Sequence, residues 1–271
     1  LFVLMCERPS LLLPTLQSRS AFVSVPPLAA DAVQQVLSSA GISASTLAAM
    51  GLTMDMVVRI SRGDAYRAIE LASAGPALQH YRAAMHVAGG LASGQLMPMQ
   101  AVEVLLAAID EAGSAAQEQA EREFAQMMER MSQSEARSFQ AKSNDEGVEQ
   151  RTRRRVRRAR THTLRQLMDD VAAFYRDLLV VASGANQLVS CVDQVQVLEA
   201  LRATPLASKI VGALDAIDEV PLRAEVNNAD VPLLLASLCS ELAGLASGRI
   251  RARRTLGAGS VTPQGVDLAL G

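Results

Sequence analysis

The sequence predicts a mostly α-helical protein that begins with two β-strands, and three observations support this fold class. The composition is 49% hydrophobic but only 3% aromatic, with no Trp, which suits helix bundles better than sheets. From Leu28 onward the apolar residues recur with the period of helices, whereas residues 1–27 hold two short continuous apolar runs. With 271 residues the chain is long enough for roughly two domains.

Residues 1–27 are predicted to form a strand, a short turn of helix and a second strand. The first run, LFVLMC, is apolar throughout, as in a strand covered on both faces, and it stops at Arg8-Pro9. The segment LLLPTLQ is too short for a full helix, and AFVSV is closed by Pro26-Pro27. Two strands cannot bury a core, so we expect them to end an α/β domain whose other strands precede Leu1.

The rest of the chain is predicted to be helical in two parts. Residues 28–75 carry three or four short helical patterns, one of them with Asp64 as its N-cap, and Gly75-Pro76 marks a boundary. Residues 77–247 carry long apolar stripes with few breakers and are predicted to form one helical bundle. The tail, 248–271, has no periodic apolar face, and we expect it to be disordered.

Charge, cysteines and hydropathy narrow the possible functions. A net charge of −2 gives no overall attraction to nucleic acid or acidic membranes, so such binding needs a local patch. The three cysteines are far apart, lie among apolar residues and form no CxxC pair, which predicts buried thiols in a reducing cytoplasm. No later apolar run approaches the ~18 residues of a membrane span. We therefore expect a cytoplasmic protein without a zinc site.

The strongest local signal is LLPTLQSRS, residues 12–20, in which Ser18 and Arg19 follow a turn that begins with Pro14. An arginine between a Pro-anchored turn and a strand has a fixed position, and its guanidinium can offer paired donors to phosphate oxygens. The alternative is a surface arginine that caps the strand through a salt bridge.

This segment resembles a motif of the bacterial clamp-loader subunits, the AAA+ proteins of the DNA polymerase III holoenzyme. Residues 12–15 and the pair Ser18-Arg19 match the family motif LLPT(I/L)xSRC, with Ser20 in place of the usual Cys. The order of strand, motif, strand, helical lid and helical collar is also similar to that family. The later segments that are similar to lid and collar segments are RGDAYRAIELA (62–72), FYRDLLV (174–180) and NNADVPLLLASLCSELA (227–243).

The resemblance implies a role for the motif arginine and a set of partners. In that family it reaches the γ-phosphate of ATP held by a neighbouring subunit, so Arg19 would be an arginine finger supplied in trans, with Ser18 beside it. Residues 1–27 would end the AAA+ base domain, 28–75 would be the lid and 77–247 the collar. The chain would bind no cofactor, because the ATP lies on the neighbour. Its partners would be the gamma/tau and delta subunits, the sliding clamp and, through the complex, primed DNA.

A further feature favours the delta-prime branch of that family, which gives an arginine without hydrolysing ATP. ATP-binding members carry a sensor-2 arginine three residues after a glycine, and this position is Tyr66, with Arg67 about 100° round the helix. No stretch of this sequence matches the phosphate-binding pattern GxxxxGK[ST], which in that family would lie upstream of Leu1. We expect no self-contained activity, only that of a subunit of a DNA-directed DNA polymerase holoenzyme. The alternative within the family is the gamma/tau ATPase.

The second candidate is RTRRRVRRAR, residues 151–160, with seven arginines in one helical stretch. Such a run could track a phosphate backbone, but it has no aromatic residues between the arginines and no groove-reading motif. A solvated helix face with pairs such as Glu149 and Arg153 is favoured, and a subunit contact or a nucleic-acid-binding scaffold are the alternatives. The contact residues would then be Arg154, Arg155, Arg157 and Arg158.

Overall fold

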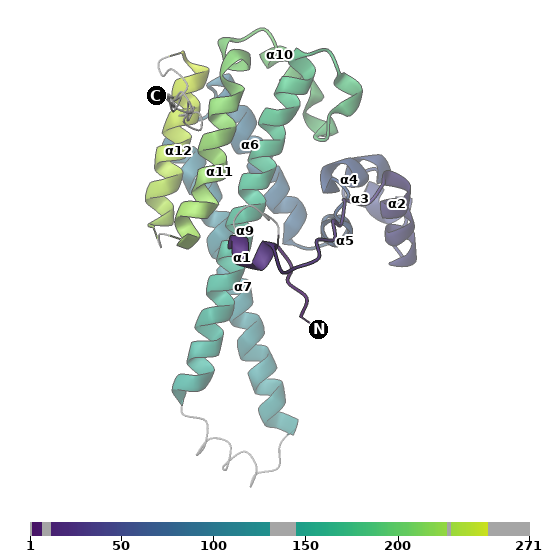
Figure 1. Ribbon diagram of the computed structural model, residues 1–271, viewed down its shortest axis with the longest axis vertical. Helices are drawn as coiled ribbons and strands as arrows, with labels where there is room; N and C mark the ends of the chain where they lie inside the picture. The colour runs from purple at the N-terminus through teal and green to yellow at the C-terminus, as the bar shows by residue number, and fades with distance from the viewer. Residues whose placement is uncertain (1, 7–11, 131–144, 227–228, 249–271) are drawn as a thin grey trace, which may run out of the picture.

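The computed structural model describes residues 2–6, 12–130, 145–226 and 229–248, and this part of the chain is mostly helical, as the composition predicts (Figure 1). The α-helices are α1 (Pro14–Gln17), α2 (Ala30–Ser39), α3 (Ala44–Ala49), α4 (Met54–Ser61), α5 (Ala65–Ala72), α6 (Pro76–Ser93), α7 (Pro98–Arg130), α9 (Asp145–Ala182), α10 (Val195–Leu201), α11 (Ile210–Val226) and α12 (Val231–Ala246). Short 3-10 turns, η2 (Asn186–Leu188), η3 (Val192–Gln194) and η4 (Pro205–Lys209), flank α10. The predicted disordered tail lies outside the described residues, except for Gly248.

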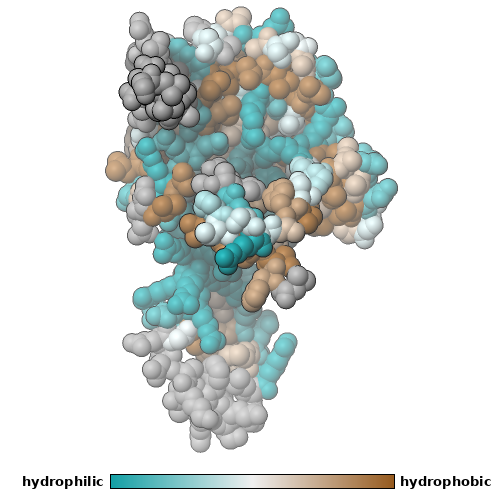
Figure 2. Space-filling view, in the orientation of Figure 1, coloured by the Kyte–Doolittle hydropathy of each residue, from teal (hydrophilic) through white to brown (hydrophobic). Residues whose placement is uncertain are grey.

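The structure does not form the two predicted N-terminal strands. Residues 2–6 and 21–25 have no regular secondary structure, and Leu1 lies outside the described residues. Phe2 and Val25 are 98% and 88% exposed, and the apolar segment near the N-terminus is visible as brown side chains in Figure 2. A strand forms only where a neighbouring strand pairs with its backbone, and no described segment does so here. Only the turn of helix between the two runs, α1, is present.

Helices α2 to α5 form a small unit whose turns are held by local capping. The side chains of Ser43, Thr53 and Asp64 accept hydrogen bonds from the backbone N–H groups three residues on, at 3.2, 3.2 and 3.0 Å. Each such cap contributes about 1 kcal/mol. Asp64 is therefore the N-cap that the sequence predicts. The backbone N–H of Leu28 donates to the carbonyl of Gly63 at 2.9 Å, and a Cβ at residue 63 would lie 2.6 Å from the carbonyl oxygen of Leu28.

The remaining helices form a bundle around α9, which packs against α6, α7, α10 and α11, while α12 covers α6, α7 and α11. Phe174 and Tyr175 of α9 are fully buried, with their rings edge to face and their centroids 5.8 Å apart. In α7 the last buried residue is Gly113. Beyond it α7 runs beside the first half of α9 as a two-helix arm that projects from the bundle (Figure 1).

Charged side chains join the small unit to the bundle. The Nη2 atom of Arg67 in α5 lies 2.5 and 2.6 Å from the two carboxylate oxygens of Asp170 in α9, and the Nη2 atom of Arg62 lies 3.5 Å from the same carboxylate. Arg59 of α4 donates to the carbonyl oxygen of Gln187 at 3.1 Å. These contacts fix α5 and the C-terminal end of α4 to α9, and α4 to η2.

Candidate functional site

The first predicted site, Ser18 and Arg19, lies at the end of the short helix α1. Pro14 occupies the first turn, where its lack of an N–H costs nothing. The Ser18 hydroxyl donates to the carbonyl of Thr15 at 3.3 Å, and the Arg19 N–H donates to the carbonyl of Leu16 at 3.3 Å. The turn therefore satisfies its own hydrogen bonds and places the two side chains at its exit.

The Arg19 side chain is exposed, and no carboxylate of the described residues forms an ion pair with it. The salt bridge that would make it a structural cap is therefore not formed within the part of the chain that the structure describes. An unpaired guanidinium keeps all its donors available for a carboxylate or a phosphate. Arg19 has the accessibility that a contact with another molecule requires.

Tyr66 and Arg67, the two residues compared above with the sensor-2 position, differ in exposure. Tyr66 is 67% exposed, whereas the Arg67 side chain is buried on Asp170. Burial raises the pKa of Asp170, against the pull of the Arg67 and Arg62 guanidinium groups, which favour the ionised carboxylate. The arginine of this helix thus serves the contact between α5 and α9 and is not open to a ligand.

The arginine run lies on α9 where this helix forms the arm with α7. Arg153 pairs with Glu149 one turn before it, at 2.6 Å, as the favoured solvated-face interpretation expects. Arg155 pairs with Glu123 of α7 at 2.6 Å, and its hydrogen bond lowers the pKa of that carboxyl. Of the four predicted contact residues, Arg155 is therefore occupied in holding the two helices of the arm together.

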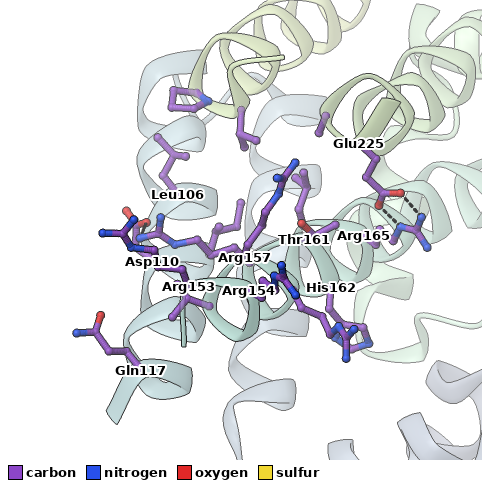
Figure 3. A pocket seen from close by; sticks show the side chains of 18 of the residues that line it. Leu106, Asp110, Gln117, Arg153, Arg154, Arg157, Thr161, His162, Arg165 and Glu225 are labelled. Atoms are coloured by element: carbon purple, nitrogen blue, oxygen red, sulfur yellow. Dashed lines mark hydrogen bonds and ion pairs between the residues drawn. The ribbon is translucent and has the colours of Figure 1, made fainter. Parts of the chain in front are cut away.

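The other three predicted contact residues, Arg154, Arg157 and Arg158, line one hollow of about 1150 Å³ (Figure 3). It lies where α9 passes α7, the end of α11 and the start of α12. We call it the arginine groove. Figure 3 shows Arg154, Arg157 and Thr161 between the Asp110 side and the hydrogen-bonded pair of Arg165 and Glu225. Its lining residues are Leu106, Ile109, Asp110 and Gln117 of α7; Glu149, Thr152, Arg153, Arg154, Val156, Arg157, Arg158, Arg160, Thr161, His162, Leu164 and Arg165 of α9; and Ala224, Glu225, Ala229, Val231 and Pro232 near the α11–α12 connection.

Sequence reasoning missed the walls of the groove that come from outside α9. Asp110 of α7 pairs with Arg160 at 3.0 Å, and Glu225 of α11 pairs with Arg165. Gly113 allows this approach, because a Cβ there would lie 2.5 Å from Nε of Arg160. Within α9 the available signal was the spacing of Arg154, Arg158 and Arg165, which places them on one helix face.

The remaining titratable groups of the described residues form no metal site. No group of His, Cys, Asp and Glu among the described residues could hold a metal ion, and no described helix is long and apolar enough to cross a membrane. Cys191 and Cys239 are buried, as predicted, and burial raises the pKa of the Cys239 thiol to about 12. Cys6 is exposed, contrary to the prediction, because the strand that would have buried it does not form.

Comparison with known proteins identifies no relative: no family model, no curated protein and no solved structure matches this chain.

Proposed function

We propose that this chain is a clamp-loader subunit of the delta-prime type, which supplies Arg19 in trans to ATP bound by a neighbouring subunit. The observation that carries the proposal is the exposed Arg19 at the exit of a Pro-anchored turn, without an ion pair among the described residues. During phosphoryl transfer negative charge spreads over the phosphoryl oxygens, and a guanidinium positioned there stabilises it. An arginine on a second subunit makes hydrolysis depend on assembly.

The arrangement of the helices supports this assignment. A small unit of short helices, α2 to α5, precedes a long helical bundle, in the order expected for the lid and collar of that family. Residues 2–6 and 21–25 would gain strand partners from an AAA+ sheet that the described residues do not form. That pairing would cover the exposed apolar side chains on both sides of α1 and hold Arg19 at the edge of the sheet.

The state of Arg67 supports the delta-prime type over the gamma/tau ATPase. Its guanidinium is buried against Asp170, 2.5 Å from the nearest carboxylate oxygen, and moving it to a nucleotide would leave that carboxylate buried. The neighbouring Tyr66 has no positive charge to offer a phosphate. The chain would therefore give an arginine without using one of its own at the sensor-2 position.

The test is ATP hydrolysis by a loader reconstituted from this protein and the gamma/tau and delta subunits of the same organism. Arg19→Ala should leave assembly intact but lower the rate of DNA-stimulated hydrolysis by at least about tenfold. An arginine finger contributes about 10³ to 10⁵ in rate, and a slow site then limits the cycle. Arg19→Lys should recover little, because an ammonium cannot reproduce the paired donors of a guanidinium.

The matched control is Arg122→Ala, an exposed arginine of α7 without an ion pair among the described residues. It should assemble and hydrolyse ATP like the unchanged protein. Failure of the unchanged chain to join the other subunits would refute the proposal. So would an Arg19→Ala loader that assembles and works at the normal rate.

A further inference from the structure

We propose that the arginine groove binds an acidic amphipathic helix of a partner protein. The groove is a different surface from Arg19, and binding there does not depend on the clamp-loader assignment. The charge, the apolar floor and the length of the groove indicate this kind of partner.

The walls of the groove carry more positive than negative charge. Six of the lining residues are arginines and three are acidic. Each acidic residue is already paired with one arginine of the groove: Asp110 with Arg160, Glu149 with Arg153, and Glu225 with Arg165. The acids therefore neutralise only part of the arginine charge.

Two arginines of the groove have no acidic partner of their own. Arg154 and Arg158 are both exposed, and neither forms an ion pair or side-chain hydrogen bond within the described ranges. They are four residues apart, so they lie on one face of α9, about 6 Å apart along its axis. Like charges at this spacing repel each other, and an anion between them would replace that repulsion with attraction. The occupant should therefore bring carboxylates or phosphates to this face.

The floor of the groove is apolar, and this favours the carboxylates of a protein over the phosphates of a nucleic acid. Ile109 and Leu164 are buried, and Leu106, Val156 and Val231 are half-buried, so aliphatic side chains line the hollow below the arginines. None of the lining residues is Phe, Tyr or Trp. Single-stranded nucleic acids are held largely by stacking bases on aromatic rings. Aliphatic side chains with flanking carboxylates match the groove better, as in helices that bury an apolar face in a partner.

The length of the groove fits a short helix. Glu149 and Arg165 mark its extent along α9, and sixteen residues of helix span about 24 Å. A partner helix of between four and five turns would cover this distance, with its apolar face on Leu106, Val156 and Val231 and its acidic residues at Arg154 and Arg158. The volume of about 1150 Å³ is large for a small-molecule site, which is typically about 300–1,000 Å³.

The test measures binding of a designed peptide by fluorescence anisotropy. The probe is a fluorescein-labelled helical peptide of about 16 residues, with Leu at i, i+3, i+4 and i+7 and Glu on both sides of the Leu face. We expect a dissociation constant of about 50 µM or lower for the unchanged protein. A peptide of the same composition, with Leu and Glu scrambled round the helix, should bind at least tenfold more weakly.

The variant Arg154→Glu/Arg158→Glu should weaken binding of the designed peptide at least tenfold. The control Arg122→Glu/Arg130→Glu makes the same change of charge on exposed arginines of α7 outside the groove, and it should bind like the unchanged protein. All four substituted positions are exposed, and circular dichroism verifies that each variant is folded. Leu106→Gln, which alters the floor and leaves the charges, should also weaken binding.

Three results would overturn the proposal. The first is no binding of the designed peptide up to about 1 mM. The second is equal binding of the scrambled peptide or equal loss in the control variant, since charge alone would then account for binding. The third is tighter binding of labelled single-stranded DNA of about 20 nucleotides, lost in Arg154→Glu/Arg158→Glu, which would make the groove a nucleic-acid site.

Discussion

Among single substitutions that break one of the ion pairs described above, Asp170→Ala should lower the free energy of unfolding most. The Asp170 side chain is 2% exposed, and Arg67 places one nitrogen within 2.6 Å of both carboxylate oxygens. Removing the carboxylate leaves the Arg67 guanidinium, itself 11% exposed, without its counter-charge. Breaking a buried pair by deleting one partner costs about 3–5 kcal/mol. We expect a loss of this size in the free energy of unfolding.

The assay is urea denaturation followed by far-ultraviolet circular dichroism, together with hydrogen exchange measured by mass spectrometry. Exchange should rise first in α4 and α5, because Asp170 holds them to α9. The control is Arg153→Ala, which removes an exposed pair with Glu149 and should cost no more than about 0.5 kcal/mol.

A second variant separates the ion pair from the packing around it. Replacing both partners, as Arg67→Met/Asp170→Leu, removes the charges together and leaves no buried ion alone. This double variant should be more stable than Asp170→Ala. The reasoning would be refuted if Asp170→Ala cost less than about 1 kcal/mol, or if exchange in α4 and α5 remained unchanged.

Three further predictions concern a buried histidine, the three cysteines and a buried tyrosine. Burial lowers the pKa of His80 in the folded protein, so the unfolded chain, with an ordinary His pKa of about 6.5, binds the proton more readily. Stability should therefore fall as the pH drops from about 7 toward 5, and urea titrations of His80→Gln should show a smaller fall. Cys6 is exposed and should react rapidly with a thiol reagent such as DTNB. Cys191 and Cys239 should react only after unfolding, because burial hides their thiols and raises the thiol pKa values. Rapid reaction of all three cysteines in the folded protein would contradict the packing. The buried Tyr175 hydroxyl has no hydrogen-bond partner in the described part of the chain, so Tyr175→Phe should change the free energy of unfolding by less than about 1 kcal/mol, and a larger loss would reveal a partner.

Local features of the fold were predictable from the sequence because short-range chemistry determines them. Asp64 caps α5 through a hydrogen bond within one turn, and Gly75-Pro76 begins α6 because proline fits the first helical position. The apolar stripe through Phe174 and Leu178 is buried as its period indicates. Each of these signals lies within a few residues of the feature that it predicts.

Short-range sequence features could predict neither the absence of the two N-terminal strands nor the shape of the groove. The runs at 2–6 and 21–25 have the composition of strands, but a strand also needs a partner, which composition does not supply. The groove depends on Asp110, Glu225 and Val231, which come from three helices and meet only through the packing of the bundle. The arginine run indicated charge at this place, but not the apolar floor below it.

The composition of the α7/α9 arm separates two responses to ionic strength within one chain. Past Gly113 the described part of α7 has no buried residue, and its contact with α9 includes the exposed pair of Arg155 and Glu123. Dissolved salt weakens such exposed pairs, with a Debye length of about 8 Å at physiological concentration, whereas it does not screen the contacts between aliphatic side chains inside the bundle. Raising the salt concentration should therefore weaken the contact between α7 and α9 in the arm, while the packing of the bundle that carries the arm stays the same.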